Sequence, residues 1–129
     1  MKRPFPIFPS SDQLRSEFPD NCSWLPKDLT DAQYSDFLEC GQFLIYKSRS
    51  STQTYSAYRN DVERFLLWTW CIKGQSLPYF SKNPYDIEGF FDFINNPPRN
   101  WSAQGQRKHL VEGNLPNPDW KPFKITESE

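Results

Sequence analysis

The sequence predicts an all-α fold, a small bundle of three to four helices between a proline-rich N-terminal arm and an irregular C-terminal segment. Three segments carry apolar residues at helical spacing, and each begins at a residue suited to cap a helix. The 129 residues fit one domain with appendages. Because 17% of the residues are aromatic, most of the buried apolar area should come from Phe, Tyr and Trp.

The predicted arm spans residues 1–29. It contains five prolines and shows no sustained periodicity of a helix or a strand. Proline fixes φ and removes a backbone donor, so we expect extended or turning chain here. We expect the aromatic side chains of the arm to pack onto the domain, and the sequence leaves open whether the whole arm belongs to the fold.

The helical domain is predicted to span residues 30–96, and its first helix begins at "TDAQ". There Thr30 and Gln33 form a capping box, and the helix should end near Lys47. The face predicted to be buried carries Tyr34, Phe37, Leu38, Gly41, Leu44 and Ile45. The solvent face should carry Asp31, Asp36, Glu39 and Gln42.

The second helix is predicted to begin with Ser51 or Thr52 as its cap and to stop at Gly74. Its length is about 22 residues, or roughly 33 Å. The predicted buried stripe is Tyr55, Tyr58, Val62, Phe65, Leu66 and Ile72. Trp68 and Trp70 fit two interpretations, core residues or exposed rings that dock onto a partner.

The third helix is predicted to open at "NPYD", with Asn83 as the cap, Pro84 at the first helical position and Asp86 near the positive end of the dipole. Its predicted apolar stripe is Ile87, Phe90, Phe91 and Ile94. The sequence "NNPP" should end it, because a residue before proline avoids the helical region.

Residues 97–129 form the third predicted segment, which is basic and irregular. The stretch "RKHLVEGNLPNPDWKPF" allows a hairpin around "EGN", and its prolines make the second arm an edge strand or coil. A fourth helix, which would complete the bundle, is not apparent before the chain ends at "KITESE".

Several function classes are disfavoured. No apolar run approaches the ~20 residues that span a bilayer, and no signal peptide is recognisable, so we expect a soluble, intracellular protein. Cys22, Cys40 and Cys71 are widely spaced and should be reduced thiols. His109 has only Glu112 near it at helical spacing, which favours a surface histidine over a metal ligand. We therefore expect no metal or other cofactor, and no catalytic constellation is visible.

Charge is distributed unevenly, although the net charge is only −1. Residues 47–64 hold four cations and two acids, and residues 99–109 hold three cations and no acid. The first patch coincides with the start of the second helix, where the dipole and unpaired N–H groups favour phosphate. Loops rich in Ser and Lys also serve capping and solvation alone, so composition leaves both interpretations open.

The stretch "SSTQTYSAYRNDVERFLLWTWCIKGQSL", preceded by "YSDFLECGQFLIYKSRS" and followed by "NPYDIEGFFDFI", resembles the N-terminal, SAM-like core-binding domain of tyrosine recombinases, the phage-integrase and Xer-type family. The matching residues are Ser51, Thr54, Tyr58, Asp61, Phe65, Gly74, Leu77, Asp86 and Ile87. The downstream "NPDWKPF" is similar to a segment in integrases of mobile genetic elements, so the resemblance covers about residues 30–125.

The resemblance implies a helical bundle that lies on one face of duplex DNA during site-specific recombination or DNA integration, while a C-terminal catalytic domain clasps the other face. It also implies a bacterial or phage-encoded protein acting in the cytoplasm at the nucleoid. Charge and resemblance together give the expected DNA-binding residues: Lys47, Arg49, Ser51, Thr52, Gln53, Thr54, Ser56, Arg59, Asn60, Arg99, Arg107 and Lys108. Among these, Gln53 or Asn60 would reach base edges, and the last three would form a second anchor on the DNA backbone.

The family's catalytic Arg residues, its H-x-x-R motif and its late nucleophilic Tyr are not found here. We therefore do not expect this chain to cut DNA by itself; it is interpreted as an excised domain of a longer recombinase or as a truncated remnant. The expected partners are duplex DNA, the catalytic domain of the parent chain and other recombinase subunits. The alternative is a protein-interaction module for subunit assembly, which docks through Phe5, Phe8, Trp68 and Trp70.

Overall fold

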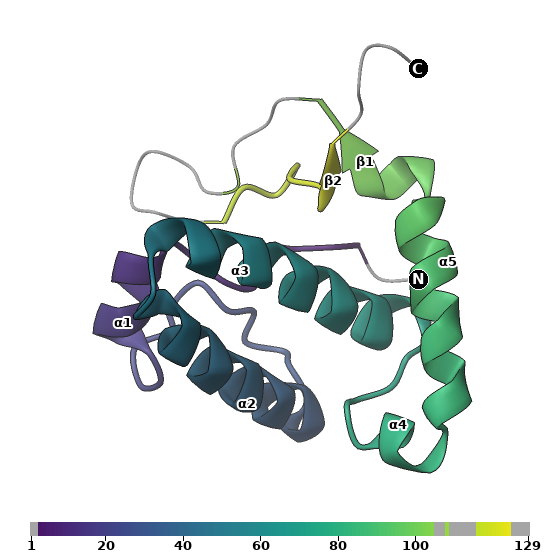
Figure 1. Ribbon diagram of the computed structural model, residues 1–129, viewed down its shortest axis with the longest axis horizontal. Coiled ribbons are helices and arrows are strands. Elements are labelled where there is room, and N and C mark those ends of the chain that lie inside the picture. The colour runs from purple at the N-terminus through teal and green to yellow at the C-terminus, as the bar shows by residue number, and fades with distance from the viewer. Residues whose placement is uncertain (1–2, 105–107, 109–115, 125–129) are drawn as a thin grey trace.

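The structure is a computed structural model that describes residues 3–104, 108 and 116–124. In these residues the chain is mostly helical, which confirms the predicted all-α class. Two long helices, α2 (Asp31–Ser48) and α3 (Thr52–Leu67), are joined by a short turn and pack side by side (Figure 1). The remaining elements are α1 (Ser11–Glu17), a π-helical turn (Trp68–Ile72), α4 (Tyr79–Lys82), a 3₁₀ turn (Pro84–Ile87), α5 (Glu88–Asn95), a second 3₁₀ turn (Arg99–Trp101), β1 (Ser102–Ala103) and β2 (Phe123–Lys124).

The capping box predicted for α2 is present. The Thr30 hydroxyl accepts from the Gln33 amide at 3.1 Å, and the Gln33 side chain accepts from the Thr30 amide at 2.9 Å. Phe37, Gly41 and Leu44 are buried as predicted. The prediction was wrong for Asp36, whose carboxylate is buried and accepts from the Trp70 indole and the Leu77 amide, each at 3.0 Å. Tyr34, expected in the core, is 42% exposed.

α3 begins and ends close to its predicted limits. Ser51 is its cap, the chain continues through the π-helical turn, and Gly74 follows with φ of 65°. Tyr55 and Leu66 are buried, but Tyr58 and Ile72 are at the surface. The π-helical turn shifts the phase of the residues after Leu67, which explains the error at Ile72.

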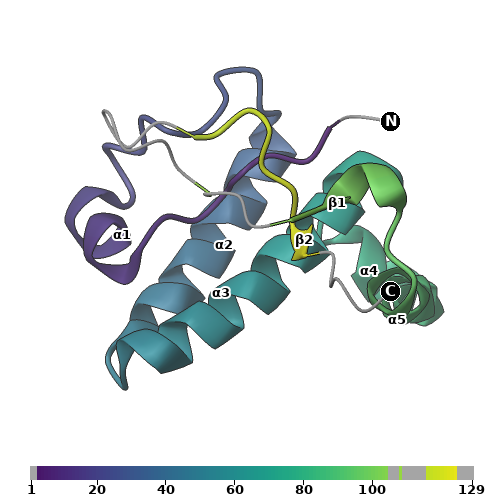
Figure 2. The ribbon, with the colours of Figure 1, turned by 90° about the horizontal axis from the view of Figure 1, so that it is seen from above.

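The N-terminal segment is part of the core, and its helix α1 was not predicted. Ile7 and Phe8 are fully buried, and the backbone around them is hydrogen-bonded to other elements. The Trp24 indole donates to the Ile7 carbonyl at 2.7 Å, and the Tyr55 hydroxyl donates to the Pro9 carbonyl at 2.6 Å. Figure 2 shows this segment crossing the α2–α3 pair on the same side as the C-terminal segment.

The third predicted helix starts differently from the prediction. Asn83 does not cap it; its side chain donates backward to the Tyr79 carbonyl at 3.1 Å, and Asp86 accepts from the Tyr79 hydroxyl. The first four residues form a 3₁₀ turn, which rotates each residue by about 20° more than an α-helix does and so shifts the stripe by about 80°. As a result Phe93 is buried, whereas Phe91 is 55% exposed.

The C-terminal segment returns to the domain instead of leaving it. β1 and β2 pair in parallel, with Ser102 opposite Phe123. The turn of the predicted hairpin, around "EGN", lies outside the described residues, as do Arg107 and His109. Lys108 and Asn117 lie on either side of that turn, and the Asn117 amide donates to the Lys108 carbonyl at 3.0 Å.

Trp68 and Trp70 are core residues, which settles the choice that the sequence left open. Both indoles are at most 4% exposed, and Phe8 is fully buried. Phe5 is half-buried and stacks on Trp70. Docking onto a partner through these four rings is therefore wrong, because the protein's own core occupies them. In the part of the chain that the structure describes, no helix is both long and apolar enough to cross a membrane.

Candidate functional site

The turn between α2 and α3 contains the first group of predicted site residues. The Ser51 hydroxyl accepts from the Thr54 amide at 3.0 Å and donates to the Thr54 hydroxyl at 2.9 Å. Both hydroxyls thus serve the helix cap. Arg49, Thr52 and Gln53 are exposed around the cap. The turn is a cap and also an exposed cationic surface, so the two interpretations of this stretch are compatible.

Lys47 lies in an aromatic cluster that was not predicted. Its Nζ lies 4.7 Å from the centre of the Tyr58 ring, 5.5 Å from that of Phe43 and 5.7 Å from that of Tyr46. These contacts between a cation and ring faces hold a half-buried lysine against the helix pair. The spacing of Phe43, Tyr46 and Lys47 along one helix face was the available signal in the sequence.

Farther along α3, Asn60 is exposed and Ser56 and Arg59 are half-buried. The Arg59 guanidinium lies 5.9 Å from the Tyr55 ring centre, and its Nη2 donates to the Asn60 amide oxygen at 3.4 Å. Arg59 Nε is buried and has no acceptor among the residues that the structure describes. Arg59 is thus only partly accessible, unlike the exposed phosphate contact expected from the sequence.

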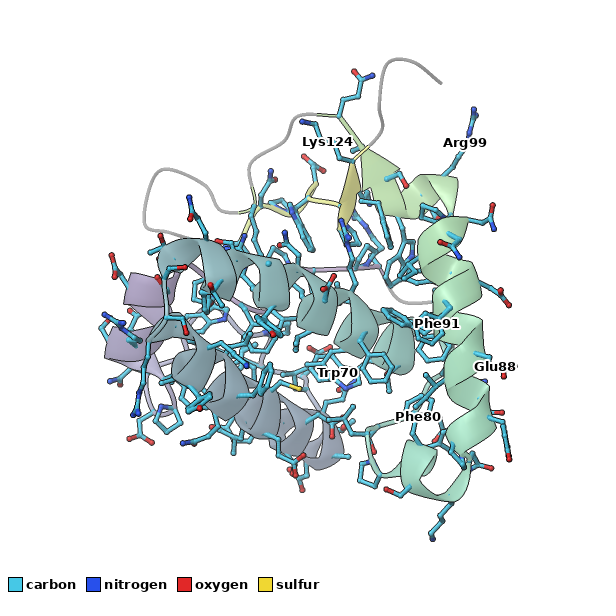
Figure 3. The ribbon with its side chains drawn as sticks, in the orientation of Figure 1. Trp70, Phe80, Glu88, Phe91, Arg99 and Lys124 are labelled. Carbon is cyan, nitrogen blue, oxygen red and sulfur yellow. The ribbon has the colours of Figure 1, made fainter. Side chains whose placement is uncertain are left out.

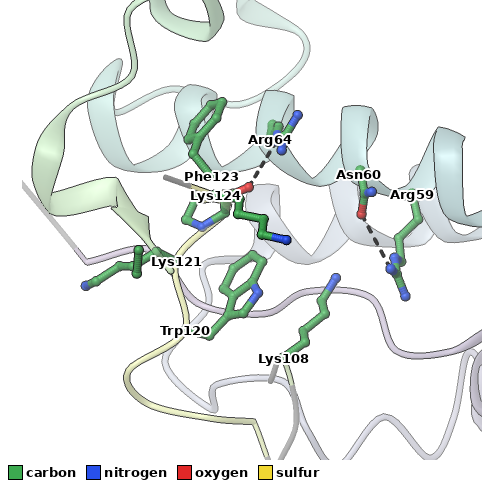
Figure 4. Close-up of a pocket in the computed structure, with 10 residues that line it drawn as sticks. Arg59, Asn60, Arg64, Lys108, Trp120, Lys121, Phe123 and Lys124 are labelled. Carbon is green, nitrogen blue, oxygen red and sulfur yellow. Dashed lines mark hydrogen bonds between the residues drawn. The ribbon is translucent and has the colours of Figure 1, made fainter. Parts of the chain in front are cut away.

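Arg59 and Asn60 line a pocket of about 260 Å³ between α3 and the C-terminal segment (Figure 4). The lining residues are Arg59, Asn60, Arg64, Ala103, Lys108, Trp120, Lys121, Pro122, Phe123 and Lys124. Five of these ten residues are cations and none is an acid. Sequence reasoning did not select Arg64, Lys121 or Lys124 as site residues, although the alternation of aromatic and basic residues in "WKPFK" was a usable signal.

Lys108, which the sequence predicted as a DNA anchor, lies in an ion pair and is mostly buried. Its ammonium forms an ion pair with the Glu63 carboxylate and lies 5.2 Å from the Trp120 ring centre. The Lys108 side chain is only 15% exposed. The pKa of Lys108 is lowered to about 8, chiefly by burial; Glu63 opposes this shift, and the charges of Arg59 and Arg64 contribute to it.

The second anchor is not assembled as predicted. Arg99 is exposed but does not line the pocket, and Figure 3 places it near the end of the molecule that carries Lys124. Arg107, the third predicted member, lies outside the described residues. In its place the structure brings Lys121 and Lys124 to the side of α3.

The Cys22 and Cys40 thiols are poorly suited to nucleophilic chemistry. Burial raises the pKa of Cys22 to about 11 and that of Cys40 to about 12, with nearby carboxylates adding to both shifts. Both thiols therefore stay protonated at neutral pH. Within the described ranges, no group of three or more His, Cys, Asp and Glu residues is placed to hold a metal ion.

Comparison of the chain with protein-family models, with curated proteins and with solved structures gives no match in any of the three.

Proposed function

We propose that this chain is a DNA-binding module of the core-binding type found in tyrosine recombinases, and that it holds duplex DNA at a recombination site. The observation that carries the proposal is the surface at the start of α3. No acidic residue occurs between Lys47 and Asn60, and Arg49, Thr52, Gln53 and Asn60 are exposed. This surface therefore combines cations, amides and hydroxyls, the groups that contact a DNA backbone.

In the proposed complex, Arg49 pairs with a phosphate beside the N-terminus of α3, where the helix dipole adds positive potential. Gln53 and Asn60 lie seven residues apart, or about 10 Å along the helix axis. That distance is comparable with three base-pair steps of roughly 3.4 Å, so two amides on one helix reach neighbouring parts of a groove.

The proposal predicts modest, salt-dependent binding because the whole chain carries a net charge of −1. If the surface neutralises about three phosphates, the affinity should fall roughly fortyfold between about 50 and 200 mM salt. Fluorescence anisotropy with labelled duplex DNA at these two salt concentrations measures the effect. Absence of binding at the lower concentration, or binding that ignores salt, contradicts the proposal.

A matched pair of variants localises the contact. Arg49→Gln removes one proposed phosphate contact and should reduce the slope of log affinity against log salt by about 1. Arg15→Gln makes the same change at an exposed position on α1 and should leave the slope unchanged. Equal effects of the two variants would indicate a nonspecific charge effect.

The proposed partners follow from the same type of domain: duplex DNA, a catalytic domain on the parent chain and other recombinase subunits. Reading the coding sequence beyond the Glu129 codon tests the parentage. An in-frame segment with an H-x-x-R motif and a late Tyr supports a recombinase, whereas an in-frame domain of another kind contradicts it.

A protein-interaction module remains the second candidate, now with different residues. Tyr46, Tyr85 and Phe91 are 63%, 83% and 55% exposed, an unusual number of large rings at the surface of a small protein. Light scattering over a range of protein concentrations tests self-association, and a monomer throughout removes that version of the candidate.

A further inference from the structure

The pocket between α3 and the C-terminal segment has an excess of positive charge. Glu63 is the acid that pairs with Lys108, and its other oxygen accepts from the Ile7 and Phe8 amides at 2.6 and 2.9 Å. The other four cations of the pocket are Arg59, Arg64, Lys121 and Lys124. In the described part of the chain, no carboxylate forms an ion pair with any of these four side chains.

Both walls of the pocket are fixed by contacts that do not need a ligand. Arg64 Nε donates to the Pro122 carbonyl at 3.1 Å, and its guanidinium lies 4.5 Å from the Phe123 ring centre. Phe123 is buried, meets Phe93 edge-on at 5.2 Å, and belongs to β2, which is paired with β1. The C-terminal wall is thereby tied to α3, and the Lys124 side chain extends from it toward Lys108 and Arg59 (Figure 4).

The contacts of Arg64 leave its terminal amino groups available. The Pro122 carbonyl accepts from Nε and the Phe123 ring lies against the guanidinium, whereas the planar fork of Arg suits the oxygens of a phosphate. Exposed Lys124 extends toward Lys108 and Arg59, and the Lys121 side chain points away from them (Figure 4). This combination of two guanidinium groups and one lysine is suited to an oxyanion.

The size of the pocket restricts the ligand further. About 260 Å³ is below the range of roughly 300–1,000 Å³ that is typical of sites for drug-sized molecules. We infer that this pocket is a binding site for a phosphate group, bound by Arg59, Arg64 and Lys124. The phosphate belongs either to a small free molecule or to a nucleic acid strand, and the site adjoins the surface at the start of α3, with which it shares Asn60.

The inference has a pH signature through Lys108. The groups that face its ammonium are Glu63, Arg59 and Arg64 from α3 and Trp120 from the C-terminal segment. A bound anion favours the protonated form of Lys108, whose pKa is about 8 without ligand. Proton and phosphate should therefore bind cooperatively, and phosphate affinity should fall as the pH rises through 8.

Titration of the whole chain with inorganic phosphate, followed by amide chemical shifts in NMR spectra, tests the inference. Sodium chloride at the same ionic strength is the reference. We expect saturating shifts at Asn60, Lys121 and Lys124 that report one dissociation constant. Shifts that do not saturate, or that concentrate elsewhere, overturn the inference.

The double variant Lys121→Gln/Lys124→Gln removes the proposed ligand Lys124 together with the neighbouring Lys121, and neither side chain makes an ion pair in the described residues. It should weaken phosphate binding about fivefold, since each partly exposed pair is worth up to about a factor of five. Lys27→Gln/Lys82→Gln removes the same charge at exposed positions outside the pocket and should leave the dissociation constant unchanged. Equal weakening by both double variants, or by neither, overturns the inference.

Two further titrations distinguish the source of the phosphate. Duplex DNA that displaces inorganic phosphate from Lys124 supports the site as a contact for a nucleic acid backbone. A nucleoside monophosphate that binds more tightly than inorganic phosphate, with no displacement by DNA, supports a small free ligand. Because inorganic phosphate is the primary probe, the inference can hold even where the DNA-binding proposal fails.

Discussion

Replacement of Glu63 by Ala tests how the N-terminal and C-terminal segments are held against α3. The Glu63 carboxylate is 2% exposed. One oxygen accepts from the Ile7 and Phe8 amides, and the other pairs with Lys108. A single side chain on α3 therefore joins the N-terminal and C-terminal segments. Glu63 is 55 residues from Phe8 and 45 residues from Lys108 in the sequence.

The magnitude follows from what the truncation leaves behind. Removing one partner of a buried ion pair costs about 3–5 kcal/mol, because the remaining charge is uncompensated. The two amides also lose their acceptor, at about 1–3 kcal/mol each, although these losses overlap. We expect Glu63→Ala to lower the free energy of unfolding by about 4 kcal/mol, a large part of the roughly 5–15 kcal/mol that such domains have.

Urea denaturation followed by tryptophan fluorescence measures this loss. With a slope of about 1–3 kcal/mol per M urea, the midpoint should move by roughly 2 M. Asp61→Asn, a change of charge at an exposed position of the same helix, should stay within about 0.5 kcal/mol of the parent. A loss below about 1 kcal/mol for Glu63→Ala would refute the argument.

A double-mutant cycle separates the ion pair from the amide contacts. If Lys108 is the uncompensated charge, adding Lys108→Met to Glu63→Ala should recover at least about 1 kcal/mol. If the second substitution instead adds its full cost, the pair makes no net contribution and the amide contacts account for the effect.

Three more outcomes follow from buried contacts. Asp36→Ala should lower the free energy of unfolding by about 2–4 kcal/mol, because an indole N–H and a backbone N–H lose their acceptor; Asp36→Asn keeps an acceptor and should cost less than half as much in urea denaturation. Gly41→Ala should cost about 1–2 kcal/mol in thermal unfolding, since the added Cβ would overlap the Phe18 ring, whose Cζ lies 2.8 Å away, and this outweighs about 1 kcal/mol of helix propensity. Because the pKa of Lys108 is lowered from 10.5 to about 8, the unfolded chain binds more protons between these values, so stability should rise with pH across that window and Lys108→Met should abolish the rise.

The ends of α2 and of the α3 segment were predictable because their signals are local. Thr30 and Gln33 cap α2 from within one turn, Ser51 caps α3 in the same way, and Gly74 has the positive φ that ends the helical segment. Each of these features depends on residues within about four positions of each other. Tertiary contacts do not override them, because the groups they satisfy are at the surface.

The buried carboxylates were not predictable from periodicity. Asp36 was assigned to the solvent face and burial of Glu63 was not predicted, since a charged residue is almost never fully buried without partners. Their partners are N–H groups up to 41 residues away for Asp36 and 56 residues away for Glu63. No local pattern encodes such a pairing, and the same long-range contacts make the N-terminal segment part of the core.

The candidate site also has a part that local sequence predicts and a part that depends on long-range contacts. Exposure of Arg49, Thr52 and Gln53 follows from the cap and the helix phase, both local features. The cationic pocket arises only when β2 pairs with β1 and sets Lys121 and Lys124 beside α3. The sequence carried the aromatic and basic residues of this wall, but it did not show which helix they would face.

Glu63 also gives a way to separate a binding role of the pocket from a structural one. Glu63→Gln keeps an oxygen that can accept from the Ile7 and Phe8 amides, but it removes the negative charge closest to the Lys108 ammonium. Stability should fall, because Lys108 loses its partner in a buried setting. At a pH low enough to keep Lys108 protonated without Glu63, phosphate affinity of the folded protein should rise, because the net charge around the pocket becomes one unit more positive. The two quantities, measured on one variant by urea denaturation and phosphate titration, should therefore move in opposite directions. If both fall together, the cations serve the fold and the phosphate site is wrong.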